Sequence, residues 1–226
     1  MKAMILAAGR GTRLAQLTQH TPKPLIQVAG EAVISHTLRR LAGYGFTQVV
    51  INAHHLAQQL MDQVGDGQNW GVEITWSLEE NLLETGGGVC KALPFLGTEP
   101  FLVVNGDIMW DLDLQPLLQA FNSQTMDILL ALVVNPPGFR GDFLLQPDGR
   151  LSRGQGEVHS FTYGGIQIIQ PTILAGEPVE PFSLNRIYDQ AITTGRLHGV
   201  VLTGHWLDMG TPERLAMAEH IWGNKP

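Results

Sequence analysis

The sequence predicts an α/β protein, a sandwich of helices on a mixed sheet, and two patterns along the chain support this class. In the first half, short apolar runs rich in β-branched residues alternate with amphipathic stretches of helical length, which is typical of parallel strand–helix–strand units covered on both faces. The second half is richer in strands, and Pro147-Asp148-Gly149-Arg150 predicts a tight turn between antiparallel strands. Since no repeat, low-complexity tract or linker interrupts the chain, we expect a single domain over residues 1–226.

The apolar runs predict strands and the amphipathic stretches predict helices. The predicted strands are Ala3–Ala7, Gln48–Asn52, Glu73–Ser77, Phe101–Asn105, Asp127–Val134, Leu144–Gln146, Thr162–Ile169, Gly199–Leu202 and His205–Asp208. The predicted helices are Ala32–Tyr44, Leu56–Gly65, Gly87–Leu93, Leu114–Asn122, Leu184–Thr194 and Pro212–Trp222. The last helix has a clear start, because Thr211 can cap it, Pro212 suits its first position and Glu213 complements the helix dipole.

Composition narrows the class of protein. Hydrophobic residues make up 44% of the 226 residues and charged residues 15%, which allows a substantial core and argues against disorder. The net charge of −7 disfavours a broad nucleic-acid or membrane-binding surface, and no run of about 20 apolar residues predicts a membrane span. The N-terminus is too poor in apolar residues for a signal peptide, so we expect a cytoplasmic protein. The lone cysteine, Cys90, allows no internal disulfide and is expected to be a packed thiol. The oligomeric state does not follow from the sequence.

A glycine loop directly after the first predicted strand is the strongest local signal. In Leu6-Ala7-Ala8-Gly9-Arg10-Gly11-Thr12-Arg13-Leu14, the two glycines let backbone N–H groups turn toward a phosphate without hindrance from Cβ. Arg13 adds a forked cation that suits phosphate oxygens. Lys23 follows between Pro22 and Pro24, which stiffen the backbone and hold the ammonium group in a fixed direction. The residues expected to bind phosphate groups are Ala8, Gly9, Gly11, Thr12, Arg13 and Lys23.

Other interpretations of this loop are weaker. It could be an ordinary strand-to-helix turn. A dinucleotide-binding fingerprint is disfavoured because Leu14 stands where the third glycine belongs, and a P-loop is excluded because no Gly-Lys-Ser or Gly-Lys-Thr occurs. The glycine pair alone would be weak evidence, and its combination with Lys23 makes it strong.

Leu6 to Leu14, together with Pro22-Lys23-Pro24-Leu25, resembles the signature of the sugar nucleotidyltransferase family. The resemblance implies a Rossmann-like core, a three-layer α/β/α sandwich on a mixed, mostly parallel sheet. It also implies an NTP and a sugar 1-phosphate as substrates and Mg²⁺ as cofactor. In the family the loop wraps the triphosphate, and the residues that match Arg13 and Lys23 stabilise it. A Pro-Leu-Thr triplet is frequent downstream of the loop, where this chain has Gln16-Leu17-Thr18, a minor departure.

Two aspartates at predicted strand ends are candidate metal ligands. Asp107 follows the apolar strand that ends in Asn105-Gly106, and Asp208 ends a strand just before a glycine turn and a helix. Mg²⁺ usually binds one or two carboxylates plus substrate phosphates, and ligands of open α/β sheets collect at the carboxyl ends of strands. Either aspartate could instead have a local role, such as capping a turn. Both match the family's metal-binding positions, so the resemblance implies a Mg²⁺ site at Asp107 and Asp208.

The resemblance also implies where the base of the nucleotide binds. In the family, a Gly-Thr segment that matches Thr85 and Gly86 lies against the base, and a glutamine about six residues earlier contacts a pyrimidine edge. Glu79 falls at that distance here, and its carboxylate can accept a hydrogen bond from the uracil N3–H but cannot donate one. The glycines Gly86-Gly87-Gly88 permit close approach of a flat ring, and a flexible hinge is the alternative.

The sugar side is implied by two further segments. Arg140-Gly141-Asp142-Phe143 and Tyr163-Gly164-Gly165-Ile166 match places where relatives contact the phosphosugar, although many relatives carry Asn-Thr-Gly in the second. We expect substrate contacts at Asn105, Asp142 and Gly165, and Asp142 could equally bond a backbone turn.

The implied reaction is in-line attack of the sugar phosphate on the α-phosphorus of the NTP, with release of pyrophosphate. Arg13 and Lys23 are the expected catalytic residues, because they and Mg²⁺ would neutralise the developing charge. Within the family, the chain is similar to the short members that transfer a uridylyl group from UTP to N-acetylmuramate α-1-phosphate during cell-wall recycling. Enzymes for glucose 1-phosphate or mannose 1-phosphate share most of these motifs. A non-catalytic nucleotide-sugar sensor also stays open, as does a nicotinamide-dependent oxidoreductase, which the broken glycine fingerprint disfavours.

Overall fold

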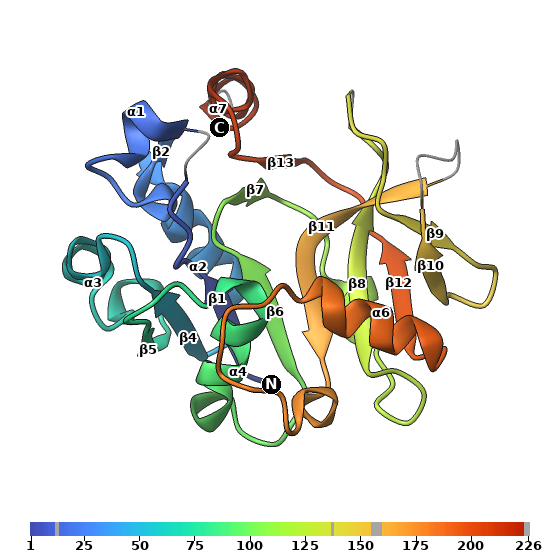
Figure 1. Cartoon of the computed structure of the whole chain (residues 1–226). Helices are drawn as coiled ribbons and strands as arrows, with labels where there is room; N and C mark the ends of the chain where they lie inside the picture. Colours follow the sequence, from blue (N-terminus) through green and yellow to red (C-terminus); the bar gives the residue numbers. More distant parts are fainter. Residues whose placement is uncertain (12–13, 137, 155–159, 224–226) are drawn as a thin grey trace.

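A nine-stranded mixed sheet forms the middle layer of the protein, in a computed structural model that describes residues 1–11, 14–136, 138–154 and 160–223 (Figure 1). The main path of the sheet runs β10 (Leu151–Arg153), β9 (Phe143–Leu145), β11 (Ser160–Ile169), β6 (Phe101–Asn105), β1 (Ala3–Leu6), β4 (Gln48–Ala53) and β5 (Glu73–Leu78). Outside this path, β8 (Ile128–Val133) pairs with both β11 and β12 (Leu197–Val201).

Helices and short sheets complete the described chain. The helices are α1 (Ala15–Thr18), α2 (Val33–Gly43), α3 (Ala57–Val64), α4 (Glu84–Leu96), α5 (Gln115–Ala120), α6 (Asn185–Thr193) and α7 (Pro212–Gly223). The 3₁₀ turns are η2 (Lys23–Leu25), η3 (Gln68–Trp70) and η4 (Pro171–Leu174). Two small antiparallel sheets pair β2 (Gln27–Val28) with β3 (Glu31–Ala32), and β7 (Ile108–Trp110) with β13 (Trp206–Asp208).

Strand β1 lies at the centre of the parallel half of the sheet. It pairs in parallel with β4 on one side and with β6 on the other, and β4 pairs in parallel with β5. Residues 3–5 are completely buried, as expected for a strand covered on both faces, which explains its unbroken apolar sequence. Leu6 stands opposite Asn52 on β4 and Asn105 on β6, so three strands end at the same level.

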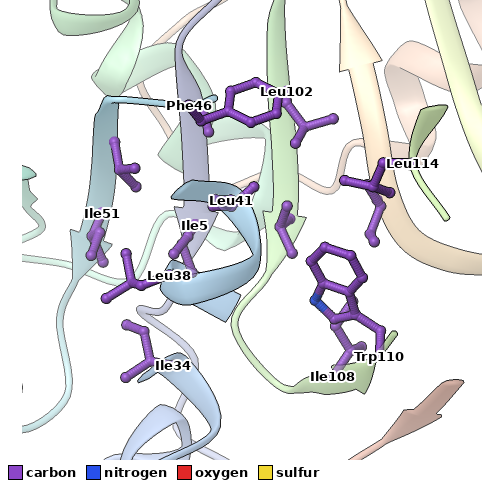
Figure 2. Packing of buried hydrophobic residues seen from close by; sticks show 14 of the residues in the cluster. Ile5, Ile34, Leu38, Leu41, Phe46, Ile51, Leu102, Ile108, Trp110 and Leu114 are labelled. Carbon is purple, nitrogen blue, oxygen red and sulfur yellow. The ribbon is translucent and has the colours of Figure 1, made fainter. Parts of the chain in front are cut away.

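Two hydrophobic cores, one on each face of the sheet, confirm the predicted α/β class and its three layers. Because side chains of a strand alternate between faces, Ile5 packs into one core and Met4 into the other. Figure 2 shows the first core, where Leu38 and Leu41 of α2 pack against Ile5 and Ile51. The second core receives apolar side chains of α4, η4 and α6. Among the described helices, none is both long and apolar enough to cross a membrane.

The second half of the chain adds antiparallel strands to this core. Strand β11 pairs antiparallel with β6, β8 and β9, and β9 pairs antiparallel with β10. The turn predicted between the last two is confirmed, since the Gly149 N–H donates to the Gln146 carbonyl at 2.9 Å and Gly149 has φ +85°. The left-handed backbone at this position suits glycine.

All predicted strands and helices overlap observed ones, and the differences have local causes. Strand β7 was not predicted, because three residues are too few for a periodic pattern. Helix α4 begins at Glu84 and not at Gly87, so Gly86, Gly87 and Gly88 lie inside it. The Arg214 N–H faces the Thr211 hydroxyl at 3.4 Å, in agreement with the predicted start of α7.

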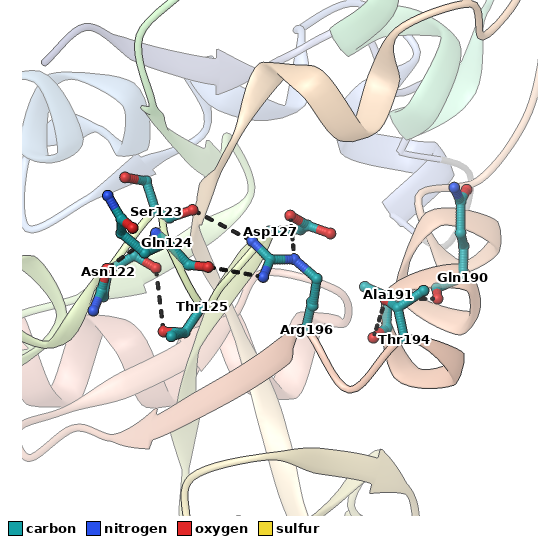
Figure 3. A network of polar contacts seen from close by, with 9 residues as sticks. All are labelled: Asn122, Ser123, Gln124, Thr125, Asp127, Gln190, Ala191, Thr194 and Arg196. Atoms are coloured by element: carbon teal, nitrogen blue, oxygen red, sulfur yellow. Dashed lines mark hydrogen bonds and ion pairs between the residues drawn. The ribbon is translucent and has the colours of Figure 1, made fainter.

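A polar cluster ties β12 to β8 at the end of the sheet where both strands begin (Figure 3). The Arg196 side chain donates from Nε to Asp127 at 2.8 Å and from its terminal nitrogens to the carbonyls of Gln124 at 3.0 Å and Ser123 at 3.3 Å. The Asp127 N–H donates in turn to the Arg196 carbonyl at 3.0 Å. One guanidinium group therefore satisfies three acceptors from a connection that would otherwise be held by few contacts.

Replacing Arg196 with alanine should lower the free energy of unfolding by about 1–3 kcal/mol, because a partly buried carboxylate loses a charge-assisted hydrogen bond. Urea denaturation followed by circular dichroism would measure the change. Arg39→Ala is the matched control, since Arg39 pairs with Glu31 in solvent and its loss should change stability by less than about 0.5 kcal/mol. Equal changes in the free energy of unfolding for the two substitutions would contradict a stabilising role of the Arg196 cluster.

Candidate active site

A cavity of about 440 Å³ lies at the carboxyl ends of β1, β4 and β6. This edge of an α/β sheet is where small ligands bind, and the volume suits a small-molecule site. Its lining includes Leu6 from β1, Asn52 from β4 and Asn105 from β6. The residues predicted from the sequence that line it are Ala8, Gly9, Gly11, Lys23, Thr85, Asn105 and Asp107. Because Gly210 also lines the cavity, the structure brings together segments that lie up to about 200 residues apart.

The glycine loop forms one wall of this cavity. Gly11 has φ +63°, in the left-handed region that favours glycine, and a Cβ there would lie 2.8 Å from Thr18 Cγ2. The Thr18 hydroxyl donates to the carbonyl of Gly11 at 2.9 Å or of Leu14 at 3.1 Å. The segment Gln16-Leu17-Thr18, which stands in place of the Pro-Leu-Thr triplet, therefore keeps the threonine whose hydroxyl bonds to the loop. The predicted phosphate ligands Thr12 and Arg13 lie outside the described residues.

Lys23 and Asp107 meet at the cavity, as an ion pair between the loop region and the end of β6. Lys23 begins the 3₁₀ turn η2, preceded by Pro22 and followed by Pro24, so its backbone is held as the sequence predicts. Its Nζ donates to Asp107 Oδ2 at 2.5 Å, and the lysine side chain is only 9% exposed. A cation this buried needs a partner, and the partner is a predicted metal ligand.

Asp208 lies beside Asp107 because of the small sheet that the sequence did not predict. Asp208 is opposite Ile108 in the β7–β13 pair, and the Met209 N–H donates to the Asp107 carbonyl at 2.7 Å. The Asp208 carboxylate pairs with Arg214 on α7. Gly210, two residues further on, lines the cavity.

The two carboxylates suit a cation that also takes ligands from a substrate. Each has a cationic partner in the protein, Lys23 for Asp107 and Arg214 for Asp208. Within the described part of the chain, no group of three or more His, Cys, Asp and Glu residues could hold a metal ion by itself. Carboxylate oxygens are ligands that Mg²⁺ prefers, and Mg²⁺ usually completes its shell with water and phosphate oxygens. The residues present therefore fit Mg²⁺ bound together with a nucleotide.

Glu79, the residue expected to contact a base, binds the protein's own chain. Its Oε1 accepts from Asn52 Nδ2 at 2.7 Å, and its Oε2 accepts from the Leu83 N–H at 2.9 Å. Asn52 Oδ1 accepts in turn from the Ala7 N–H at 2.7 Å. Because Glu79 is 5% exposed and both oxygens are engaged, we infer a structural role for it, in which it joins the segment 79–83 to the start of the glycine loop.

The glycines of α4, where a base contact is expected at Gly86, lie close to other parts of the protein. A Cβ at Gly86 would overlap the Phe182 ring, and a Cβ at Gly87 would overlap the Glu180 carbonyl oxygen. A Cβ at Gly88 would lie 2.8 Å from Asn52 Nδ2. In the direction of Cβ, these glycines therefore leave no room for a side chain. Thr85 does line the cavity, and its Oγ1 accepts from the Leu184 N–H at 2.9 Å.

A second cavity of about 210 Å³ adjoins the first and shares Leu6, Thr85, Asn105 and Ser183 with it. Asp142 lines this cavity, and its Oδ2 also accepts from the Tyr163 N–H at 2.8 Å, so its position agrees with both roles that the sequence left open. Gly165 is not part of either lining. It has φ +73°, and a Cβ there would lie 3.0 Å from Asn105 Nδ2, so Gly165 makes room for Asn105.

Several site residues were missed by sequence reasoning. Asn52 ends a predicted strand, and its place beside the glycine loop could have been inferred from that position. Gly106 brings its N–H to 2.8 Å from the Leu6 carbonyl, and a Cβ there would lie 2.6 Å from the same oxygen. Glu84 lines the cavity with φ +56°, an uncommon conformation for a non-glycine residue. Neither backbone feature leaves a signal in the sequence.

The remaining candidate nucleophile and bases have structural explanations. Cys90 is buried, and burial raises the pKa of its thiol to about 11, which confirms the predicted packed thiol. His54 Nδ1 lies 3.0 Å from the Glu79 carbonyl oxygen and His55 Nε2 3.2 Å from that of Thr18, so both imidazoles brace loops around the site.

Comparison with known proteins matches the chain along its length. Residues 2–139 match a family model described as nucleotidyl transferase. The chain is 42% identical to an N-acetylmuramate alpha-1-phosphate uridylyltransferase of Neisseria meningitidis serogroup B, over 99% of each protein. It is 35% identical to a protein of the same name from Caulobacter vibrioides, over 96% of this chain and 95% of that one. Among solved structures, HddC from Yersinia pseudotuberculosis with bound GMP-PN has a TM-score of 0.82 at 23% identity, over 98% of this chain and 99% of that one. This last likeness confirms the fold.

Glu79→Ala should lower the free energy of unfolding by about 1–3 kcal/mol, because the Asn52 amide and the Leu83 N–H would lose their acceptor in a buried place. Urea denaturation gives the value. Glu80→Ala, an exposed neighbour, is the control and should unfold like the wild type. If Glu79→Ala kept full stability and only lost affinity for UTP, the structural role would be refuted.

Proposed function

The chain belongs to the nucleotidyl transferase family, and on this premise we propose that it transfers a uridylyl group from UTP to N-acetylmuramate α-1-phosphate. The products are UDP-N-acetylmuramate and pyrophosphate. The observation that carries the proposal is the cavity in which the glycine loop, Lys23 and Asp107 lie together. The substrate pair is that named for the two relatives that match nearly the whole chain.

The chemistry that these residues favour is in-line displacement at phosphorus. A phosphate oxygen of the sugar 1-phosphate forms a bond to the α-phosphorus of UTP, while the bond from that phosphorus to the bridging oxygen breaks and pyrophosphate leaves. The attacking oxygen is already anionic at neutral pH, so the protein needs no general base. Its task is to hold two anions in line and to neutralise their charge. Lys23 and the loop N–H groups suit this task, and we propose Arg13 as a second cation.

Mg²⁺ is the cofactor we propose, with Asp107 and Asp208 as its protein ligands and phosphate oxygens of the substrate as the others. When bound there, the metal ion would supply positive charge at the phosphates. Arg214 and Lys23 contact these carboxylates and keep them in position.

We also propose that the reaction takes place in the cytoplasm and returns a cell-wall sugar to the pool of activated precursors. A nucleoside triphosphate and a sugar phosphate are multiply charged and do not cross a lipid bilayer unaided. An enzyme that uses both therefore works where both are held. The name of the matching relatives supports the sugar, and the recycling role rests on that sugar's place in the cell wall.

Pyrophosphate release in the presence of Mg²⁺ tests the activity directly. UTP, dTTP, GTP, CTP and ATP should each be paired with N-acetylmuramate, N-acetylglucosamine, glucose and mannose 1-phosphates. We expect the highest kcat/KM for UTP with N-acetylmuramate α-1-phosphate. A higher kcat/KM for another pair would assign that pair as the substrates in place of the proposed one. Nucleotide binding without turnover across the panel would indicate a sensor.

Lys23→Ala should lower kcat/KM by about 100–1,000-fold, as expected when one preorganised charge at the reacting phosphates is removed. Steady-state pyrophosphate release measures this, with circular dichroism to show that the variant is folded. Lys2→Ala is the matched control, because the Lys2 ammonium lies at the surface, where it donates to the Phe95 carbonyl at 2.6 Å. Near-wild-type turnover by folded Lys23→Ala would refute the site.

Asp107→Ala should remove nearly all Mg²⁺-dependent turnover, since it deletes a proposed metal ligand and the partner of Lys23 at once. Asp148→Ala removes an exposed carboxylate in the β9–β10 turn and should leave turnover unchanged. If turnover by Asp107→Ala depended on the Mg²⁺ concentration in the same way as turnover by the wild type, Asp107 would be excluded as a metal ligand.

A further inference from the structure

A buried amide without a partner lines the second cavity. Gln167 of β11 has no exposed surface, and neither its Nε2 nor its Oε1 makes a hydrogen bond with any described residue. The Tyr188 hydroxyl lies near the amide, but the contact between them does not meet hydrogen-bond geometry. Buried side-chain amides are nearly always hydrogen-bonded, so an unpaired one that faces a cavity is suited to bind a polar group from outside the chain.

The groups around Gln167 are neutral and aromatic. Tyr163 and Tyr188 line the same cavity with Phe143, and the Tyr188 ring lies edge-on to both other rings at centroid distances of 6.0 and 6.2 Å. Burial raises the pKa of Tyr188 to about 12 and that of Tyr163 well above its usual value, so both hydroxyls stay protonated. This end of the cavity therefore offers uncharged hydrogen-bonding groups between apolar rings.

The charged residues of the second cavity are already engaged with the protein. Arg153 donates from Nε to Asp189 at 2.7 Å and from Nη1 to Asn185 at 3.1 Å, and its guanidinium lies over the Phe143 ring. Asp142 accepts from the backbone of Tyr163. In this lining, both polar atoms of the Gln167 amide and the hydroxyl of Tyr163 therefore lack a partner among the described residues.

A bulge in β11 lies just before Gln167. The pairing of β11 with β8 shifts register between Tyr163 and Gln167, and Gly165 supplies the left-handed residue within the shift. Bulges re-aim side chains and recur beside binding sites. In the sequence, Gln167 stands as a single polar residue in the apolar run Ile166-Gln167-Ile168-Ile169. Packing in the two hydrophobic cores does not explain a glutamine at this position.

We propose that Gln167 binds the acetamido group of the phosphosugar and determines the preference for N-acetylated sugars. The inference rests on the proposed function, because the second cavity adjoins the first through Asn105 and would hold the sugar end of the substrates. An amide side chain pairs with an acetamido group through one donated and one accepted hydrogen bond. The neighbouring aromatic rings provide apolar contact for the methyl group.

Gln167→Leu tests the proposal, because leucine removes both polar atoms at similar volume. The ligands are N-acetylglucosamine 1-phosphate and glucose 1-phosphate, which differ only in the acetamido group, each added with a non-hydrolysable UTP analogue. Thermal unfolding should show a larger Tm increase with the acetylated sugar for the wild type and equal increases for the variant. With N-acetylated substrate, kcat/KM should fall by about tenfold or more, while the KM for UTP stays unchanged.

The ligand-free variant provides a readout that separates binding from structure. Since the wild-type amide is buried without partners, Gln167→Leu should keep the Tm or raise it by about 2–4 °C. A structural glutamine would instead lower the Tm on replacement. Gln170→Leu is the matched control, because its Oε1 is also buried without a partner, at the far end of β11 and outside both linings. It should leave the sugar preference intact.

Three outcomes would overturn the proposal: no preference in the wild type, an unchanged preference in Gln167→Leu, or the same loss in Gln170→Leu. The binding comparison does not depend on catalysis. Absence of pyrophosphate release from the wild type would refute the proposed function while the difference in Tm still decides the role of Gln167.

Discussion

The parallel register of β4, β1 and β6 is the constraint on which the rest of the structure depends. Leu6 is level with Asn52 on one side and Asn105 on the other, so the chain leaves all three strands at the same edge. The glycine loop, the segment after β4 and the turn that carries Asp107 then share one small volume. The close contact of Gly106 with the Leu6 carbonyl fixes the distance between the first and third of these. Without that register, Lys23 could not reach Asp107.

The site also joins the two halves of the chain, although only the first half contains the glycine loop. Asp208 and Gly210 come from the segment before α7, Ser183 precedes α6, and Gln167 belongs to β11. These residues contribute a proposed metal ligand and the second cavity. On the proposed function, charge neutralisation at the phosphates would fall mainly to the first half, and discrimination between sugars mainly to the second.

The sequence predicted the fold class, the regular elements and much of the main cavity, because these leave patterns of spacing. Apolar runs marked the buried strands, and Lys23 between prolines with Asp107 after a strand marked the ion pair. Contacts between distant segments left no such pattern. The role of Glu79 depends on Asn52 and Leu83, and the role of Gly86 depends on Phe182, which is almost 100 residues away. In both cases the family resemblance placed a residue near the site, and only the packing showed what it contacts. Gln167 was missed because a single polar residue in an apolar strand has no periodicity.

The first turn of helix α4 is stabilised by contacts with a distant segment of the chain. Three consecutive glycines near its start each disfavour helix by about 1 kcal/mol relative to alanine, and the Glu84 backbone adds an unfavourable conformation. The segment 180–182 covers this turn, with the Phe182 carbonyl accepting from the Gly86 N–H at 2.8 Å. The first turn of α4 should therefore become ordered only after a segment synthesised much later has docked on it. As the chain leaves the ribosome, this turn would then stay unformed until residues 180–182 emerge, and the wall of the cavity that carries Thr85 would be among the later parts to form.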